Sequence, residues 1–128
     1  MGAPEPEAAR PFGAAYGAAG LLRATGVLAA RRTCLLPRDL LARHGLSPEA
    51  FIAAPAGEPA RAALLDVVRQ GRMLLADARR GHVPRHAVAA ILPATLARRD
   101  LARWPAVAAP RGLGDRLAVV FAGITGRV

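Results

Sequence analysis

Apolar residues recur every three or four positions over long stretches of the sequence, a pattern that predicts amphipathic helices. The clearest case runs from about Pro59 to Arg80, where the helical period holds almost without interruption. Further helices are predicted over residues 13–30 and Leu113–Thr125. No stretch alternates convincingly with the period of two that a half-buried strand requires. The pattern therefore predicts an all-α fold with short Pro/Gly turns between its helices.

Proline and glycine divide the rest of the chain into shorter elements. Pro37 prevents simple continuation of the first long helix, and the short helix that follows can end on Gly45 as a C-terminal cap. Ser47 directly before Pro48 is typical of a helix start, here of a helix reaching to about residue 54. The segments APAGEP and WPAVAAPRGLG are predicted linkers. Between them, a helix that begins near Pro84 should be kinked or shifted by a second, internal proline, Pro93.

The predicted domain organisation is simple. Residues 1–12 are expected to form a flexible lead, and residues 13–128 one helical domain. Three glycines inside the first long helix lower its helix propensity, so we expect them to mark close packing against a neighbour; they are Gly17, Gly20 and Gly26.

Composition and charge limit the kinds of partner that this protein is expected to bind. All 18 positive side chains are arginine, and the net charge is +9, which favours an acidic partner. The arginines, however, form isolated doublets near predicted helix ends, at residues 31–32, 79–80 and 98–99, where they complement the helix dipole. Nucleic-acid binding is therefore the least favoured function. The lone Cys34, the absence of a membrane-spanning apolar stretch and the lack of a signal peptide predict a cytoplasmic protein.

Candidate catalytic groups are sparse. Of the nine acids, Glu5 and Glu7 lie in the expected lead, and each of the others is at least eight residues from the next, so no pair shares a helix turn. His82 and His86 have the spacing of a helical metal pair, but Pro84 separates them and no acid or cysteine completes a site. The residues by themselves predict no catalytic residues and no metal site.

The segment AYGAAGLLRATGVLAARRTCLLPRDLLARHGLSPEAF resembles the second signature region of the squalene/phytoene synthase family. The resemblance extends over about residues 14–104. It depends most on residues that match the motif in order, namely Leu22-Arg23, Gly26, Arg31, Leu36-Pro37 and Asp39-Leu40-Leu41. It implies a partial isoprenoid-synthase-like helical bundle, corresponding to the C-terminal part of the family's domain.

Enzymes of that family hold prenyl diphosphates through Mg²⁺ ions bound by two aspartate-rich motifs. Here Ala24 and Leu28 stand where the two aspartates of the second motif are expected, Val27 replaces the intervening acid, and Gly20 replaces the asparagine, while Arg23 is kept. The first motif would precede this chain. The resemblance thus implies no cofactor, with Mg²⁺ needed only in an enzymatic alternative. It further implies a residual pocket near Tyr16, Arg31, Pro37 and Asp39.

These departures resemble a noncatalytic branch of the family, the respiratory complex I assembly factors. That branch implies a protein partner, such as a respiratory-complex subunit, and peripheral contact with the inner membrane through arginine-rich helix ends. The alternative is a prenyltransferase that condenses isoprenyl diphosphates, as a fragment or with acids from a partner chain. A half-bundle would also expose apolar helix faces, which predicts self-association.

Overall fold

The computed structural model describes the backbone of residues 6–80, 88–106 and 111–125. Within these ranges every regular element longer than a turn is an α-helix, which confirms the all-α prediction. The helices are, in chain order, α1 (Pro6–Ala30), α2 (Arg38–Arg43), α3 (Pro48–Ala53), α4 (Glu58–Arg80), α5 (Val88–Arg103) and α6 (Leu113–Thr125).

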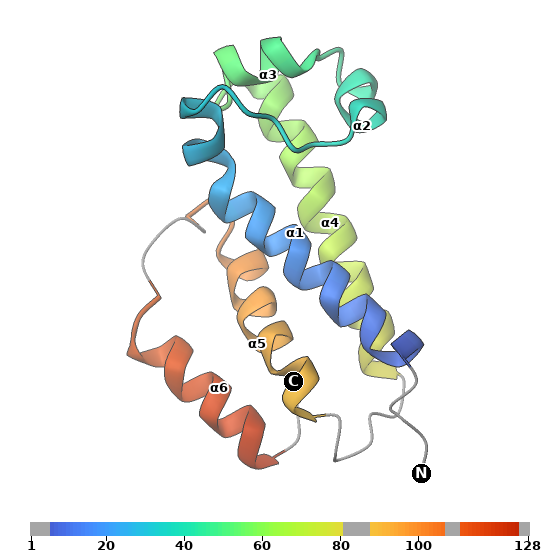
Figure 1. Ribbon diagram of the computed structural model, residues 1–128, viewed down its shortest axis with the longest axis vertical. Coiled ribbons are helices and arrows are strands. Elements are labelled where there is room, and N and C mark those ends of the chain that lie inside the picture. Colours follow the sequence, from blue (N-terminus) through green and yellow to red (C-terminus); the bar gives the residue numbers. More distant parts are fainter. Residues whose placement is uncertain (1–5, 81–87, 107–110, 126–128) are drawn as a thin grey trace.

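Three long helices make the body of the molecule (Figure 1). α1 packs along α4 on one side and along α5 on the other, and these are the most extensive contacts between described helices. The short helices α2 and α3 lie at the end of the bundle where α4 begins, and α6 packs chiefly against α5. α1 is therefore the central element, and its side away from α4 and α5 faces outward.

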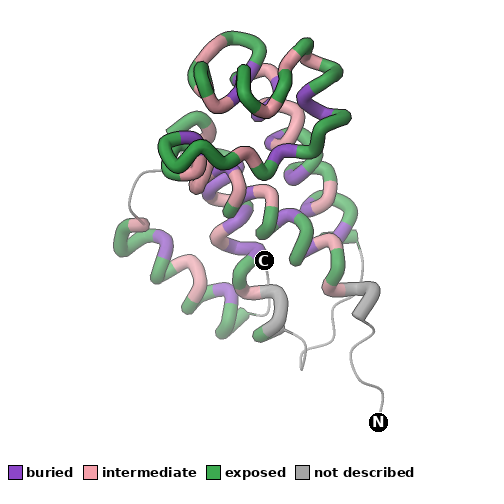
Figure 2. The backbone as a smooth tube through the Cα atoms, turned by 45° about the horizontal axis from the view of Figure 1, so that its top comes forward, coloured by how far each residue is buried: buried purple, intermediate pink, exposed green. Residues whose placement is uncertain are grey.

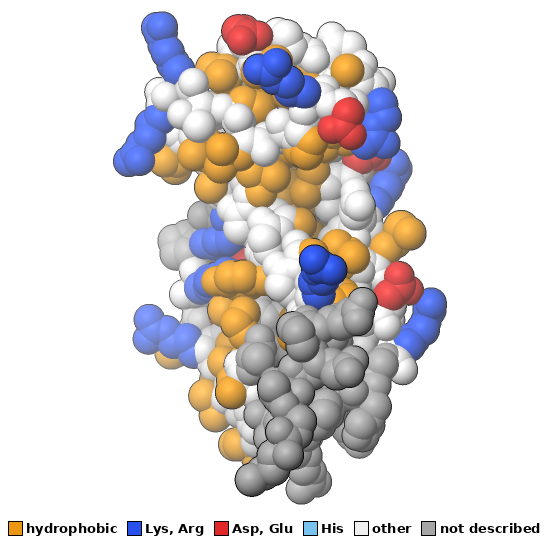
Figure 3. Space-filling view, turned by 45° about the vertical axis from the view of Figure 1, so that its right-hand side comes forward, with side chains coloured by type: hydrophobic (Ala, Val, Ile, Leu, Met, Phe, Trp, Pro, Cys, Tyr) orange, Lys and Arg blue, Asp and Glu red, His pale blue; other side chains and the backbone are white. Residues whose placement is uncertain are grey.

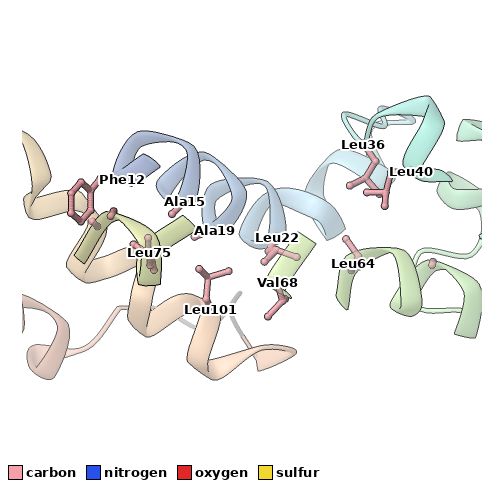
Figure 4. Close-up of a cluster of buried hydrophobic side chains, with 14 of the residues drawn as sticks. Phe12, Ala15, Ala19, Leu22, Leu36, Leu40, Leu64, Val68, Leu75 and Leu101 are labelled. Carbon is pink, nitrogen blue, oxygen red and sulfur yellow. The ribbon is translucent and has the colours of Figure 1, made fainter. Parts of the chain in front are cut away.

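Small residues on α1 allow the long helices to approach closely. Ala15 and Ala19 are fully buried, and Figure 4 shows them facing the aliphatic side chains of α4 and α5. Gly71 of α4 makes the tightest contact: a Cβ atom there would lie 2.9 Å from Cδ1 of Leu101. A larger residue at this crossing would force the buried Leu101 side chain to move, so glycine favours the close approach of the two helices.

The two short helices end and begin as their sequences predict. Gly45 has φ of +67° and its N–H donates to the carbonyl of Ala42, which is the predicted C-terminal cap of α2. Ser47 Oγ accepts a 3.1 Å hydrogen bond from the N–H of Ala50 at the start of α3. Leu41 and Phe51 anchor these helices in the core, while most of their other residues are exposed (Figure 2).

The beginning of the first helix differs from the sequence-based expectation. α1 starts at Pro6, so residues 6–12 belong to the helix and not to a flexible lead. Pro11 lies inside α1 and removes one helical hydrogen bond. The next residue, Phe12, is only 3% exposed and packs into the core, which offsets that loss. α5 likewise continues through Pro93, whereas the helix start expected at Pro84 lies outside the described residues.

The expected role of three glycines in α1 was wrong. No described residue lies within 4 Å of the position that a Cβ would take at Gly17, Gly20 or Gly26. Gly17 and Gly20 lie on exposed parts of α1, away from α4 and α5. Close helix packing in this chain depends on the alanines of the inner side of α1, whereas Gly17 and Gly20 lie on its outer side and Gly26 borders the groove beside Leu22.

Candidate functional site

The five motif positions of α1 do not share one environment. Successive helix residues are turned by about 100°, which places Ala24 on the side of α1 opposite the buried Leu22. Gly20 and Leu28, one turn to either side of Ala24, share this outer side. None of the three brings an oxygen atom in its side chain. The outer side of α1 therefore presents no side-chain ligand to a hard cation at the positions where the resemblance expects aspartates.

The remaining two motif positions, Arg23 and Val27, border a groove of about 620 Å³. Its walls come from α1, from the residues before and at the start of α4, and from the residues that follow α5. Leu22, Leu64 and Trp104 give it an apolar lining, and Arg61 adds a second guanidinium group beside that of Arg23. The groove carries positive charge, but no carboxylate lines it.

Arg23 pairs with Asp100, an acid that has no other acid near it in the sequence. Asp100 of α5 is 1% exposed, and its Oδ1 accepts a 3.3 Å hydrogen bond from Nη1 of Arg23, 77 positions away in the chain. Its Oδ2 accepts a 2.8 Å bond from Nη2 of Arg111. The bond to Asp100 is the main reason that the pKa of Arg111 is raised, and Tyr16 adds a smaller effect. Both oxygens of Asp100 are thus paired with arginines.

A second buried acid joins α6 to α5. Asp115, also 1% exposed, accepts hydrogen bonds from Nε of Arg99 at 2.6 Å and from Nη1 of Arg103 at 2.9 Å. The N–H of Gly112 donates to the same carboxylate at 3.1 Å, which closes the first turn of α6. Arg103 first, and Arg99 next, hold the pKa of Asp115 well below its usual range. Arg99 belongs to the arginine doublet at residues 98–99 and lies within α5. Its partner is the carboxylate of Asp115, in addition to any interaction with the helix dipole.

A third acid, Asp66, connects the end of α2 to α4. His44 Nε2 lies 2.8 Å from Oδ2 of Asp66, and Nη1 of Arg69 lies 3.3 Å from Oδ1 of the same carboxylate. His44 has the largest part in lowering the pKa of Asp66, and Arg69 contributes less. Asp66 with Arg69, and Asp77 with Arg80 at 3.0 Å, are pairs three residues apart on the surface of α4. The contact from His44 was not predicted, because it crosses between helices.

The residues expected around a residual pocket lie apart. Tyr16 and Arg31 are both on or next to α1 but about 22 Å apart along its axis. Pro37 and Asp39 are exposed residues at the start of α2. None of the four lines the groove beside Arg23.

The described residues do not fit a bound metal–diphosphate group. The part of the chain that the structure describes contains no group of three or more His, Cys, Asp or Glu side chains placed to share a metal ion. The closest acid to the motif, Asp100, is already paired through both oxygens. His82 and His86 lie outside the described residues. Among the described helices, none is long and apolar enough to cross a membrane.

Fold and site together define an all-α protein built around one central helix. The Squalene/phytoene synthase family model matches residues 2–117. The chain belongs to the squalene/phytoene synthase family. No curated protein and no solved structure matches it.

Proposed function

We propose that this member of the squalene/phytoene synthase family is noncatalytic and acts by binding a protein partner. One observation carries the proposal: the outer side of α1 bears Gly20, Ala24 and Leu28 where a prenyl-diphosphate site needs carboxylates. A diphosphate leaves only when its charge is neutralised, and a bridging metal does this best. Side chains without oxygen cannot hold that metal.

The pairing of Asp100 supports the same conclusion. A carboxylate that served a metal at the motif would have to face it with a free oxygen. Both oxygens of Asp100 are instead paired, one with Arg23 and one with Arg111, and the Asp100 side chain is buried. Releasing Asp100 toward a metal would break both pairs of this buried carboxylate, which is costly.

The smooth outer side of α1 suits a protein partner better than a small ligand. Gly13, Gly17 and Gly20 are exposed, and no described residue occupies the space in front of them. Without side chains, these positions let another helix approach the backbone closely. Val27, which is 58% exposed, adds apolar area next to this surface. The partner that we propose is a subunit of a respiratory complex during its assembly, as the resemblance to the complex I assembly factors suggests.

The catalytic alternative is tested directly. The purified chain is incubated with farnesyl or geranylgeranyl diphosphate and Mg²⁺, and pyrophosphate release is measured beside a catalytic member of the family. We expect no release from this chain. A double variant, Ala24→Asp with Leu28→Asp, places two carboxylates one turn apart and should gain Mg²⁺-dependent affinity for a nonhydrolysable diphosphate analogue. Turnover by the unmodified chain would refute the proposal.

The partner is tested in the source organism. Deleting the gene should lower complex I activity, and the unmodified gene should restore it. Gly20→Arg places a long charged side chain on the outer side of α1, in open space, so it should fold but fail to restore activity. Met73→Arg is the matched control, because Met73 is 65% exposed on α4. Full complementation by Gly20→Arg would exclude the outer side of α1 as the binding surface, and an unchanged deletion strain would exclude the respiratory partner.

A further inference from the structure

The last helix turns its apolar side outward. Large apolar residues repeat along α6 with the spacing of one helix side, and each is more than half exposed: Leu113, Leu117, Val120, Phe121 and Ile124. We call these five residues the α6 stripe. A contiguous stripe of this kind is uncommon on a monomer and marks a surface that contacts something apolar.

The opposite side of α6 explains why the stripe cannot turn inward. Asp115 is held by Arg99 and Arg103 of α5, and Ala122 is buried against the bundle. Rotating α6 to bury the stripe would pull Asp115 away from both arginines and expose their uncompensated charges. The ion cluster thus fixes the orientation of the helix, with its acid inward and its stripe outward.

Charge indicates what covers the stripe. The chain carries a net charge of +9, so two copies repel each other, whereas an anionic surface attracts the chain. Arg116 is exposed and lies about 100° around the helix from Leu117, at the border of the stripe. On the face drawn in Figure 3, the arginine side chains stand apart with apolar side chains between them.

We infer that α6 is an interfacial helix that docks this protein on an anionic lipid bilayer. The α6 stripe enters the boundary between headgroups and acyl chains, the helix lies flat, and Arg116 reaches the lipid phosphates from its edge. At 13 residues α6 is about 20 Å long, which suits a helix lying on a membrane. This surface is separate from the outer side of α1, so the inference does not depend on the proposed function.

Vesicle flotation tests the inference on the full chain. Vesicles of equal parts phosphatidylglycerol and phosphatidylcholine should retain the protein, whereas pure phosphatidylcholine vesicles should bind it at least about tenfold more weakly. Phe121→Asp should reduce binding to the anionic vesicles by at least about tenfold, because it removes an apolar anchor and adds a repelled charge. Arg116→Gln should weaken binding by a few-fold and make it less sensitive to salt.

Met73→Asp is the matched control, since it places an acid at an equally exposed apolar position away from the α6 stripe. It should leave vesicle binding unchanged, and circular dichroism should show that all variants keep their helices. Equal loss of binding in Met73→Asp and Phe121→Asp would overturn the inference, as would equal binding to uncharged vesicles. So would a chain that ignores vesicles but forms a dimer that Phe121→Asp dissociates, because the stripe would then join two copies.

Discussion

Replacing Asp100 by asparagine tests the buried ion cluster at the centre of the bundle. The change keeps the shape of the side chain but removes the carboxylate charge that pairs with both Arg23 and Arg111. Removing one partner of a buried ion pair typically costs about 3–5 kcal/mol. The cost is smaller here because the Arg23 and Arg111 side chains are 24% and 31% exposed, so water screens the charges left behind. We expect a loss of about 2–3 kcal/mol.

Urea denaturation followed by circular dichroism measures this loss. A domain of this size has a free energy of unfolding of about 5–15 kcal/mol, so the Asp100→Asn variant should still fold. With a denaturant dependence of about 1–3 kcal/mol/M, the midpoint should fall by roughly 0.7–3 M. In a thermal scan, the same loss lowers Tm by roughly 6–15 °C.

Asp77→Asn is the matched control, because the pair of Asp77 with Arg80 lies on the surface, with side chains 61% and 79% exposed. It should change stability by less than about 0.5 kcal/mol. A double-mutant cycle of Asp100→Asn with Arg23→Gln should show a coupling of about 1 kcal/mol or more. If Asp100→Asn is no more harmful than Asp77→Asn, the cluster does not stabilise the bundle and the reasoning is wrong.

Four further substitutions test other parts of the fold. The pKa of Asp115 is lowered in the folded chain, so its pairing adds stability that is complete above about pH 4 and is lost as the pH falls toward the folded value; Asp115→Asn should flatten the acid side of a stability–pH profile. Gly20→Ala should raise the free energy of unfolding by about 0.5–1 kcal/mol. Gly71→Leu should lower it by about 1–3 kcal/mol or more, because the new side chain overpacks against Leu101. A urea midpoint that moves the other way for either variant contradicts the packing described. Ser47→Ala removes the cap of α3 and should cost about 1 kcal/mol in urea denaturation, with no change expected only if water replaces the hydroxyl.

Local chemistry made most of the helices predictable. The regular apolar period of α4, the proline after α1 and the caps at Gly45 and Ser47 each depend on residues within a few positions of one another. The start of α1 was missed because Phe12 is ordered by the core and not by its neighbours in sequence. Long-range burial thus overrides a local proline signal.

The charged clusters were not predictable in the same way. Asp100 pairs with an arginine 77 positions earlier, and no spacing rule links the two residues. One sequence signal was available: Asp100 lies directly beside the apolar stripe of α5 that includes Ala97 and Leu101. An acid at such a position must find a partner or lose its charge, so its burial predicts an arginine without saying which one. The identity of the partner comes only from the packing of α1 against α5.

The motif positions in α1 therefore differ in what the fold requires of them: Arg23 is one kind, and Gly20 and Ala24 are the other. Arg23 is needed by this fold, whether or not the protein is an enzyme, because it neutralises part of a buried carboxylate. Gly20 is exposed and Ala24 is half-buried on the side of α1 opposite the buried Leu22, and neither has a polar side chain for the described bundle to depend on. Acids on this side of α1 should therefore matter little to stability, whereas Arg23 is tied to the buried Asp100. Arg23→Gln should accordingly lower the free energy of unfolding, whereas Ala24→Asp should leave it nearly unchanged, and the opposite order would mean that the outer side of α1 supports the fold in a way that its exposure does not suggest.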